Sequence, residues 1–106
     1  MKAIVYEAYG ESSVLKETTV PVPVPGAGEV TIQAKSIGVN PVDWKLRAGY
    51  IQAWPQAFPI IPGWDVAGVV TALGEGVTDF VVGDEVYAYT RPLQPFEGGP
   101  ADAKIG

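Results

Sequence analysis

The chain has 106 residues, 47% of them hydrophobic and 18% charged, which is typical of one small globular domain. Seven basic against twelve acidic residues give a formal net charge of −5, and no run of Lys or Arg forms the stripe that nucleic acid binding requires, so nucleic acid is not an expected partner. Cysteine and histidine are both absent, which removes disulfides, thiol nucleophiles and the ligands of most zinc sites.

The first third of the chain predicts short strands and a connector. Its amino terminus meets charged residues within ten positions, so we expect no signal peptide, no membrane span and a cytoplasmic protein. Residues 2–8 and 14–20, separated by a glycine and two serines, predict a first pair of strands. Prolines at alternate positions in 21–29 predict an extended edge or connector, because proline cannot donate to a strand ladder.

Three further strands are predicted, which makes the expected fold mainly β. Residues 29–36 alternate apolar and polar side chains, as a strand with one buried face does. The expected buried residues are Val30, Ile32 and Ala34, and the expected solvent-facing residues are Thr31, Gln33 and Lys35. Residues 65–73 predict a strand that is apolar on both faces. Residues 79–89 predict another, broken at Gly83 and Asp84.

One short helix is predicted over residues 40–49. Asn40 is a good N-cap, Pro41 suits the first helical position, Asp43 can reach back to the cap, and Gly49 can end the helix. Residues 50–65 carry many aromatic side chains and prolines, and we expect a long connection there. Residues 90–106 lose the strand pattern and are expected to form a loop or a truncated tail.

The start of this helix admits two interpretations. Asn40 and Asp43 are explained most simply as a helix cap, in which the carboxylate also favours the positive helix end. The same position also places backbone amides, a side-chain amide and a carboxylate close together at the start of the helix. Such a set of donors and acceptors can bind a ribose, an amide or a carbonyl oxygen. Both interpretations stay open on the residues alone.

Over nearly its whole length, to about residue 90, the chain resembles a known domain. The motifs that carry the resemblance are "PVPVPGAGEV", "GVNPVD", "PGWDVAGVV" and "GEGVTDFVVGDEV", in that order. Together they resemble the amino-terminal, GroES-like catalytic domain of the medium-chain dehydrogenase/reductase superfamily. This resemblance implies a partly open β-barrel with one or two short helices.

Two positions place the chain within that superfamily. The zinc alcohol dehydrogenases carry a cysteine where this sequence has Asn40, and Gly-His-Glu where it has Gly63, Trp64 and Asp65. Both metal positions therefore hold residues that do not bind zinc. The remaining motif, "NPVDWKLRAGY", resembles the zinc-free quinone oxidoreductase branch, which implies NADP(H)-dependent reduction of quinones or other α,β-unsaturated carbonyls.

The resemblance also implies roles for individual residues. Asn40 would orient the substrate or the nicotinamide-ribose end of the cofactor, and Asp43 would hold the hydrogen-bond network at this cofactor-binding and catalytic position. Lys45 would lie near the oxygen that gains negative charge. Lys45 replaces a tyrosine common at that place in some quinone reductases, which bears on substrate preference. The expected walls of the substrate pocket are Trp44, Tyr50 and Trp64. As a rule, buried tryptophans more often serve packing than chemistry.

The sequence lacks the second half of such an enzyme. The glycines at 74–76 and 98–99 are isolated and read as turns, and no dinucleotide-binding Rossmann motif follows. We therefore expect an incomplete, inactive GroES-like domain over 1–106, whose apolar surface is covered by a Rossmann domain in cis or trans or by a second copy in a homodimer. The alternatives are a non-enzymatic interaction module and a domain that binds a small aromatic ligand between Trp44, Trp54 and Trp64.

Overall fold

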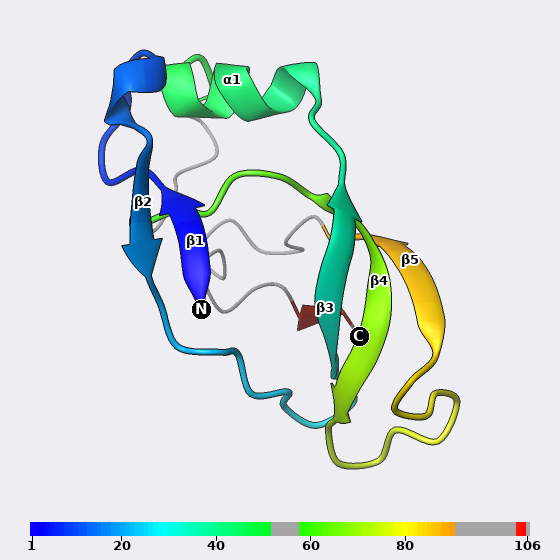
Figure 1. Cartoon of the computed structure of the whole chain (residues 1–106). Coiled ribbons are helices and arrows are strands. Elements are labelled where there is room, and N and C mark those ends of the chain that lie inside the picture. The colour runs from blue at the N-terminus through cyan, green and yellow to red at the C-terminus, as the bar shows by residue number, and fades with distance from the viewer. Residues whose placement is uncertain (52–57, 91–103, 106) are drawn as a thin grey trace.

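The computed structural model describes residues 1–51, 58–90 and 104–105 (Figure 1). The strands are β1 (Lys2–Val5), β2 (Lys16–Thr19), β3 (Val30–Ile37), β4 (Asp65–Leu73), β5 (Glu85–Tyr89) and β6 (Lys104–Ile105). The helical elements are the short 3-10 turn η1 (Ser12–Val14) and the helix α1 (Pro41–Ala48). The mainly β fold expected from the sequence is therefore confirmed. No helix in the described ranges is long and apolar enough to cross a membrane.

The strands form two antiparallel sheets. β1 pairs with β2, and the larger sheet has the order β5-β4-β3-β6. In Figure 1, α1 lies across one end of the molecule, above the two sheets, and the extended connector runs along the other end. The segment between β2 and β3 contains no strand, as its alternating prolines predict.

The core lies on one face of the larger sheet. Its centre consists of Val30 and Ile32 of β3 and Val70 of β4, with Val66 and Val86 packed against them. Val5 of β1, Tyr6 directly after it and Leu46 of α1 are buried as well. Tyr6 also joins the small sheet to the chain that enters β4, because its backbone exchanges two hydrogen bonds with Ile60, at 3.0 and 2.9 Å.

The simple alternation expected along β3 is wrong at two residues. Thr31 is buried, with only 5% of its surface exposed, whereas Ala34 is exposed. The physical reason is that the pairing with β4 slips twice, between Thr31 and Ile32 and between Ala34 and Ser36. Each slip is a bulge that turns the following side chains relative to the sheet. Thr31 satisfies its hydroxyl by donating to the Pro23 carbonyl oxygen at 3.3 Å.

The strand expected over 79–89 begins only at Glu85. Gly83 has a φ of 101°, a left-handed conformation that glycine adopts readily, and the Asp84 carboxylate accepts a hydrogen bond from the Val81 N–H at 3.0 Å. These contacts make a turn where the sequence predicted only a break. The turn stays attached to β4, since the Gly83 N–H donates to the Val70 carbonyl oxygen at 2.8 Å.

Two predicted segments fall partly outside the described residues. Of the connection over 50–65, residues 52–57 are not described, and this includes Trp54. Of the tail over 90–106, residues 91–103 and 106 are not described, whereas Lys104–Ile105 form β6 and pair with Val30 and Thr31.

Candidate functional site

The junction between β3 and α1 positions the candidate residues. Asn40 has an extended backbone and caps α1, and it forms a capping box with Asp43, whose Oδ2 accepts from the Asn40 backbone N–H at 2.7 Å. Pro41 occupies the first helical turn, and Gly49 ends the helix with a φ of 87°. The predicted helix, including both of its ends, is confirmed.

The Asn40 side chain makes a second contact that crosses from α1 to β4. Its Nδ2 donates to Oδ2 of Asp65, the first residue of β4, at 2.5 Å. Asn40, Asp43 and Asp65 are all half-buried. No local pattern in the sequence identifies this pair, because 25 residues separate Asn40 from Asp65.

A glycine makes this contact sterically feasible. A Cβ atom at Gly38 would lie 2.6 Å from Asp65 Oδ2 and 2.8 Å from Asp65 Cβ, closer than real side chains approach. The backbones are also joined, since the Gly38 N–H donates to the Asp65 carbonyl oxygen at 3.2 Å. The end of β3 and the start of β4 are thus held close enough for the two polar side chains to meet.

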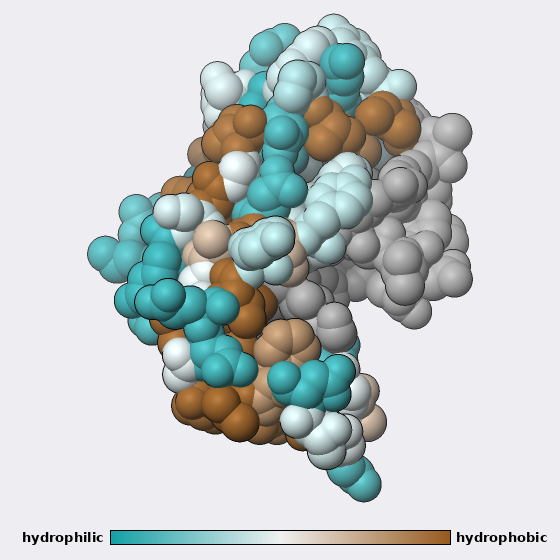
Figure 2. All heavy atoms as spheres, turned by 90° about the vertical axis from the view of Figure 1, so that its right-hand side faces the viewer, coloured by the Kyte–Doolittle hydropathy of each residue, from teal (hydrophilic) through white to brown (hydrophobic). Residues whose placement is uncertain are grey.

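Asp65 forms part of the wall of a surface hollow of about 390 Å³. The hollow is lined by Ser36, Ile37, Gly38, Asp65, Val66, Ala67, Tyr87, Ala88 and Tyr89. Figure 2 shows the side of the molecule on which β5 lies, where hydrophobic and hydrophilic side chains alternate over the visible surface. Tyr87 is 89% exposed there. The hollow therefore combines one carboxylate with aromatic and aliphatic surface.

The predicted aromatic residues lie in two separate pairs. Trp44 and Tyr50 meet edge to face on α1 and just beyond it, with ring centroids 5.5 Å apart, and the Lys45 Nζ lies 5.7 Å from the centre of the Trp44 ring. Trp64 instead meets Tyr89 at the start of β4, with centroids 6.2 Å apart. Trp44 and Tyr50 are 45% and 72% exposed, and neither lines the 390 Å³ hollow.

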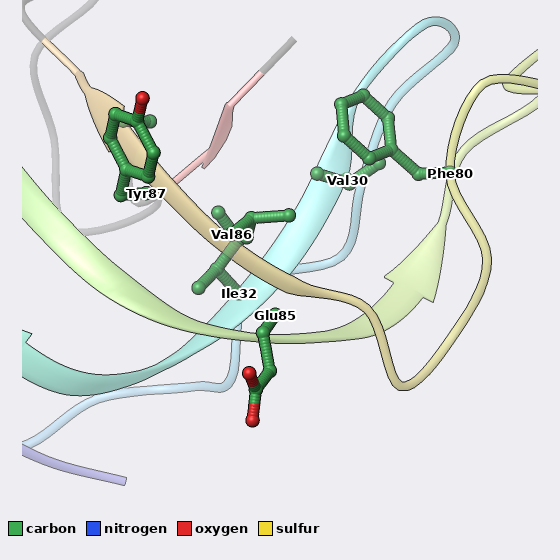
Figure 3. Close-up of a pocket in the computed structure, with 7 residues that line it drawn as sticks. Val30, Ile32, Phe80, Glu85, Val86 and Tyr87 are labelled. Atoms are coloured by element: carbon green, nitrogen blue, oxygen red, sulfur yellow. The ribbon is translucent and has the colours of Figure 1, made fainter.

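A second hollow, of about 260 Å³, lies on the core side of the sheet (Figure 3). It is lined by Val30, Ile32, Phe80, Glu85, Val86, Tyr87 and Ala88. In Figure 3, Ile32 and Val86 meet at its base, while the Glu85 carboxylate points away from them. This hollow offers apolar contact but no converging polar groups, so the junction at Asn40 and Asp65 is the better candidate for chemistry.

Sequence reasoning missed two features of this site. Tyr87 and Tyr89 alternate along β5 and face the hollow at Asp65, and the alternating "EVYAY" run could have indicated a shared face. The role of Gly38 depends on what lies opposite it on β4. No local signal in the sequence carries that information.

Comparison with known proteins identifies the domain. Residues 26–101 match the alcohol dehydrogenase GroES-like domain. The chain belongs to this family. The GroES-like domain is 44% identical over 101 residues to a chloroplastic quinone-oxidoreductase of Triphysaria versicolor, with 93% of this chain and 30% of the relative covered. It is 46% identical over 89 residues to a chloroplastic NADPH-dependent alkenal/one oxidoreductase of Arabidopsis thaliana, covering 83% of this chain and 23% of the relative.

The fold agrees with solved structures as well. The GroES-like domain superposes on a quinone oxidoreductase of Escherichia coli solved in complex with NADPH, with a TM-score of 0.76, 29% identity, and 82% of this chain and 26% of that chain covered. The resemblance to the quinone oxidoreductases of the medium-chain dehydrogenase/reductase superfamily is therefore confirmed. The chain spans less than a third of the length of these relatives.

Proposed function

We propose that this chain is the substrate-side domain of an NADPH-dependent, zinc-independent reductase of quinones or α,β-unsaturated carbonyls. The names of its relatives support the substrate class, since they include quinone and alkenal/one oxidoreductases. The structure of the Escherichia coli quinone oxidoreductase with NADPH supports the cofactor.

The observation that carries the proposal is the hydrogen bond between Asn40 and Asp65. These residues stand where the zinc enzymes of the superfamily have a cysteine ligand and the glutamate of their Gly-His-Glu motif. Here an amide and a carboxylate bind each other, and Trp64, at the histidine position, meets the Tyr89 ring. A site built in this way must stabilise a developing oxyanion with hydrogen-bond donors and positive charge in place of a metal.

In the proposed site, the residues at the start of α1 act on the carbonyl oxygen of the substrate. An N–H of the Asn40 amide donates to this oxygen, and the Lys45 ammonium adds positive charge as the oxygen becomes an enolate or hydroquinone oxygen. Asp43 fixes the backbone of Asn40 through the capping box. Trp44, Tyr50 and Trp64 supply flat apolar surface for the ring or the conjugated chain of the substrate.

The described residues do not fit the phosphates of NADPH. Residues 74–76 form a tight turn between β4 and the 77–84 segment, with Gly76 at a φ of 81°, and no helix follows to receive a pyrophosphate. We therefore assign cofactor binding to protein outside these 106 residues, in cis or in trans. The 106-residue chain alone is then inactive.

The test compares two proteins in an NADPH oxidation assay with a benzoquinone and with an enone. One is the 106-residue chain, and the other is the same chain followed by the carboxy-terminal remainder of the Triphysaria relative. We expect only the fusion to oxidise NADPH, and only when an acceptor is added. Turnover by the chain alone would refute the need for a second domain. An inactive fusion that folds and binds NADPH would refute the reductase function.

The roles of individual residues are tested in the same fusion. Asn40→Ala is expected to lower kcat roughly 100-fold, as removal of an oxyanion donor does in other enzymes. Lys45→Ala is expected to lower kcat, whereas the matched control Lys35→Ala, at an exposed position on β3, leaves it unchanged. Equal effects of the two lysine variants would contradict the role given to Lys45.

A further inference from the structure

The proposed mechanism gives no role to the Asp65 carboxylate, although this carboxylate contacts the Asn40 side chain. Asp65 does not belong to α1, yet its carboxylate holds the side chain of the residue that caps α1. We propose that Asp65 is a positioning residue, which fixes the Asn40 side-chain amide in the one orientation that presents an N–H donor to the substrate. The catalytic part of this inference rests on the proposed function, whereas the orientation of the amide does not.

The chemistry of the two groups explains why such a residue is needed. An asparagine amide can rotate by half a turn, which exchanges its donor nitrogen and its acceptor oxygen at nearly the same positions. A carboxylate only accepts, so it pairs with Nδ2 and not with Oδ1 of the asparagine. The contact between Asn40 Nδ2 and Asp65 Oδ2 therefore selects one of the two orientations.

The fold keeps a place for the Asp65 carboxylate. Gly38 leaves the space that this side chain occupies, because a Cβ atom there would lie 2.6 Å from Oδ2 and 3.1 Å from Cγ. The strand start is fixed on its other side too, since the Trp64 carbonyl oxygen accepts from both the N–H and the hydroxyl of Thr90. Asp65 is consequently held from β3 and from β5.

This arrangement has a direct consequence for the substrate. One N–H of Asn40 Nδ2 is used by Asp65, and the second remains as a donor. A substrate carbonyl oxygen that reaches the Asn40 amide then meets a donor. In the opposite orientation of the amide, the oxygen would meet an acceptor, which repels the developing negative charge. Without Asp65, only the capping-box contact of the Asn40 side chain with the Asp43 N–H favours this orientation, so the opposite orientation becomes more populated.

The first test measures the orientation by NMR on the 15N-labelled 106-residue chain. In the wild type we expect one Asn40 side-chain proton to be shifted downfield of its position in free asparagine and to exchange with water at least ~10-fold more slowly, as a hydrogen bond to a charged group predicts. Asp65→Ala should abolish both effects. Asp65→Asn, which offers a donor as well as an acceptor, should give intermediate values.

The control variant is Asp84→Ala. It removes a different aspartate, which accepts from the Val81 N–H in the turn before β5. We expect it to lower stability and to leave the Asn40 protons unchanged. Asn40 side-chain protons in the wild type with the shifts and exchange rates of free asparagine would overturn the inference even if every Asp65 variant failed to fold, and so would unchanged Asn40 protons in Asp65→Ala.

The second test is a double-mutant cycle in the fusion described above. If Asp65 acts through Asn40, Asp65→Ala should lower kcat by ~10-fold or more with a smaller change in KM, and the double variant should be no worse than Asn40→Ala alone. Additive effects would overturn the positioning role. If the wild-type fusion is inactive, the proposed function fails, and the NMR result decides the orientation by itself.

Discussion

Among the residues that the structure describes, Tyr6 has the most strongly shifted pKa. Only 1% of its surface is exposed, and its ring meets Phe58 edge to face at 6.1 Å. Burial, with a further contribution from Tyr9, raises the pKa of Tyr6 from 10.0 to about 12. The folded chain therefore keeps this phenol protonated at a pH at which the unfolded chain loses the proton.

This pKa shift predicts a loss of stability in alkali. Below pH 10 both the folded and the unfolded chain hold the Tyr6 proton, and the folded state keeps its full stability. Between pH 10 and about 12 only the folded chain holds this proton, so the free energy of unfolding falls as pH rises. The loss is on the order of 2–3 kcal/mol. Urea unfolding over this range should show it in the wild type. The Tyr6→Phe variant should show less of it, whereas the exposed control Tyr87→Phe should behave like the wild type.

At the scale of secondary structure elements, α1 depends on its cap. The helix has eight residues, too few to be stable by propensity alone, so the capping box at Asn40 and Asp43 matters more than it would in a longer helix. Leu46 is the one buried residue of α1, and it anchors the helix to the rest of the fold.

We expect Asp43→Ala to destabilise the chain by about 1 kcal/mol, because the variant loses the acceptor for the Asn40 N–H and the favourable charge in the first helical turn. Thermal unfolding monitored by circular dichroism measures the effect. Asp79→Ala, which removes an exposed carboxylate outside the helix, is the control. An equal loss in the two variants would show that the cap makes no special contribution.

β3 and β4 approach each other too closely at Gly68 to admit a side chain. A Cβ atom on Gly68 would lie 2.0 Å from the Gln33 carbonyl oxygen, which is backbone and cannot move aside alone. The strands could separate only by breaking their ladder between the two bulges of β3.

Gly68→Ala should therefore cost about 3 kcal/mol or more, or prevent folding. The measurement is the yield of soluble protein together with its urea midpoint. Ala67→Gly, at the neighbouring position of β4, changes the chain by the same single methyl group without a clash and should cost about 1 kcal/mol. A Gly68→Ala variant as stable as the wild type would contradict the close approach.

A structural feature could be predicted from the sequence when the residues that determine it lie close together along the chain. The helix limits were predictable because Asn40, Pro41, Asp43 and Gly49 act within a few residues of one another. The exposure of Ala34 was not, because it depends on bulges set by pairing with β4. The contact of Asn40 with Asp65 depends on tertiary structure in the same way. The local sequence pattern contains no information on either feature.

For the molecule as a whole, the core is small. In the described parts of the chain, the buried hydrophobic residues are Val5, Tyr6, Val30, Ile32, Leu46 and Val70. Large side chains such as Ile37, Tyr87 and Tyr89 are exposed on or near the larger sheet. A domain of this size hides a comparatively low fraction of its surface, so its stability is expected to be marginal.

We predict a free energy of unfolding below about 5 kcal/mol for the 106-residue chain. Leu46→Ala, which removes the buried side chain of α1, should lower the free energy of unfolding by about 2–5 kcal/mol and leave the chain largely unfolded. Equilibrium unfolding in urea tests both statements. A wild-type value above about 10 kcal/mol would contradict the view that the small core limits stability.

The edge-to-face pair of Trp64 and Tyr89 has a practical consequence. The two rings lie 6.2 Å apart, close enough for excitation energy absorbed by the tyrosine to reach the indole, and Tyr89 borders the hollow that Asp65 lines. A molecule that settles in this hollow changes the surroundings of Tyr89 and, through it, the fluorescence of Trp64. Tryptophan fluorescence can therefore report binding at the candidate site, and the difference between the wild type and the Trp64→Phe variant gives the part of the fluorescence that comes from Trp64.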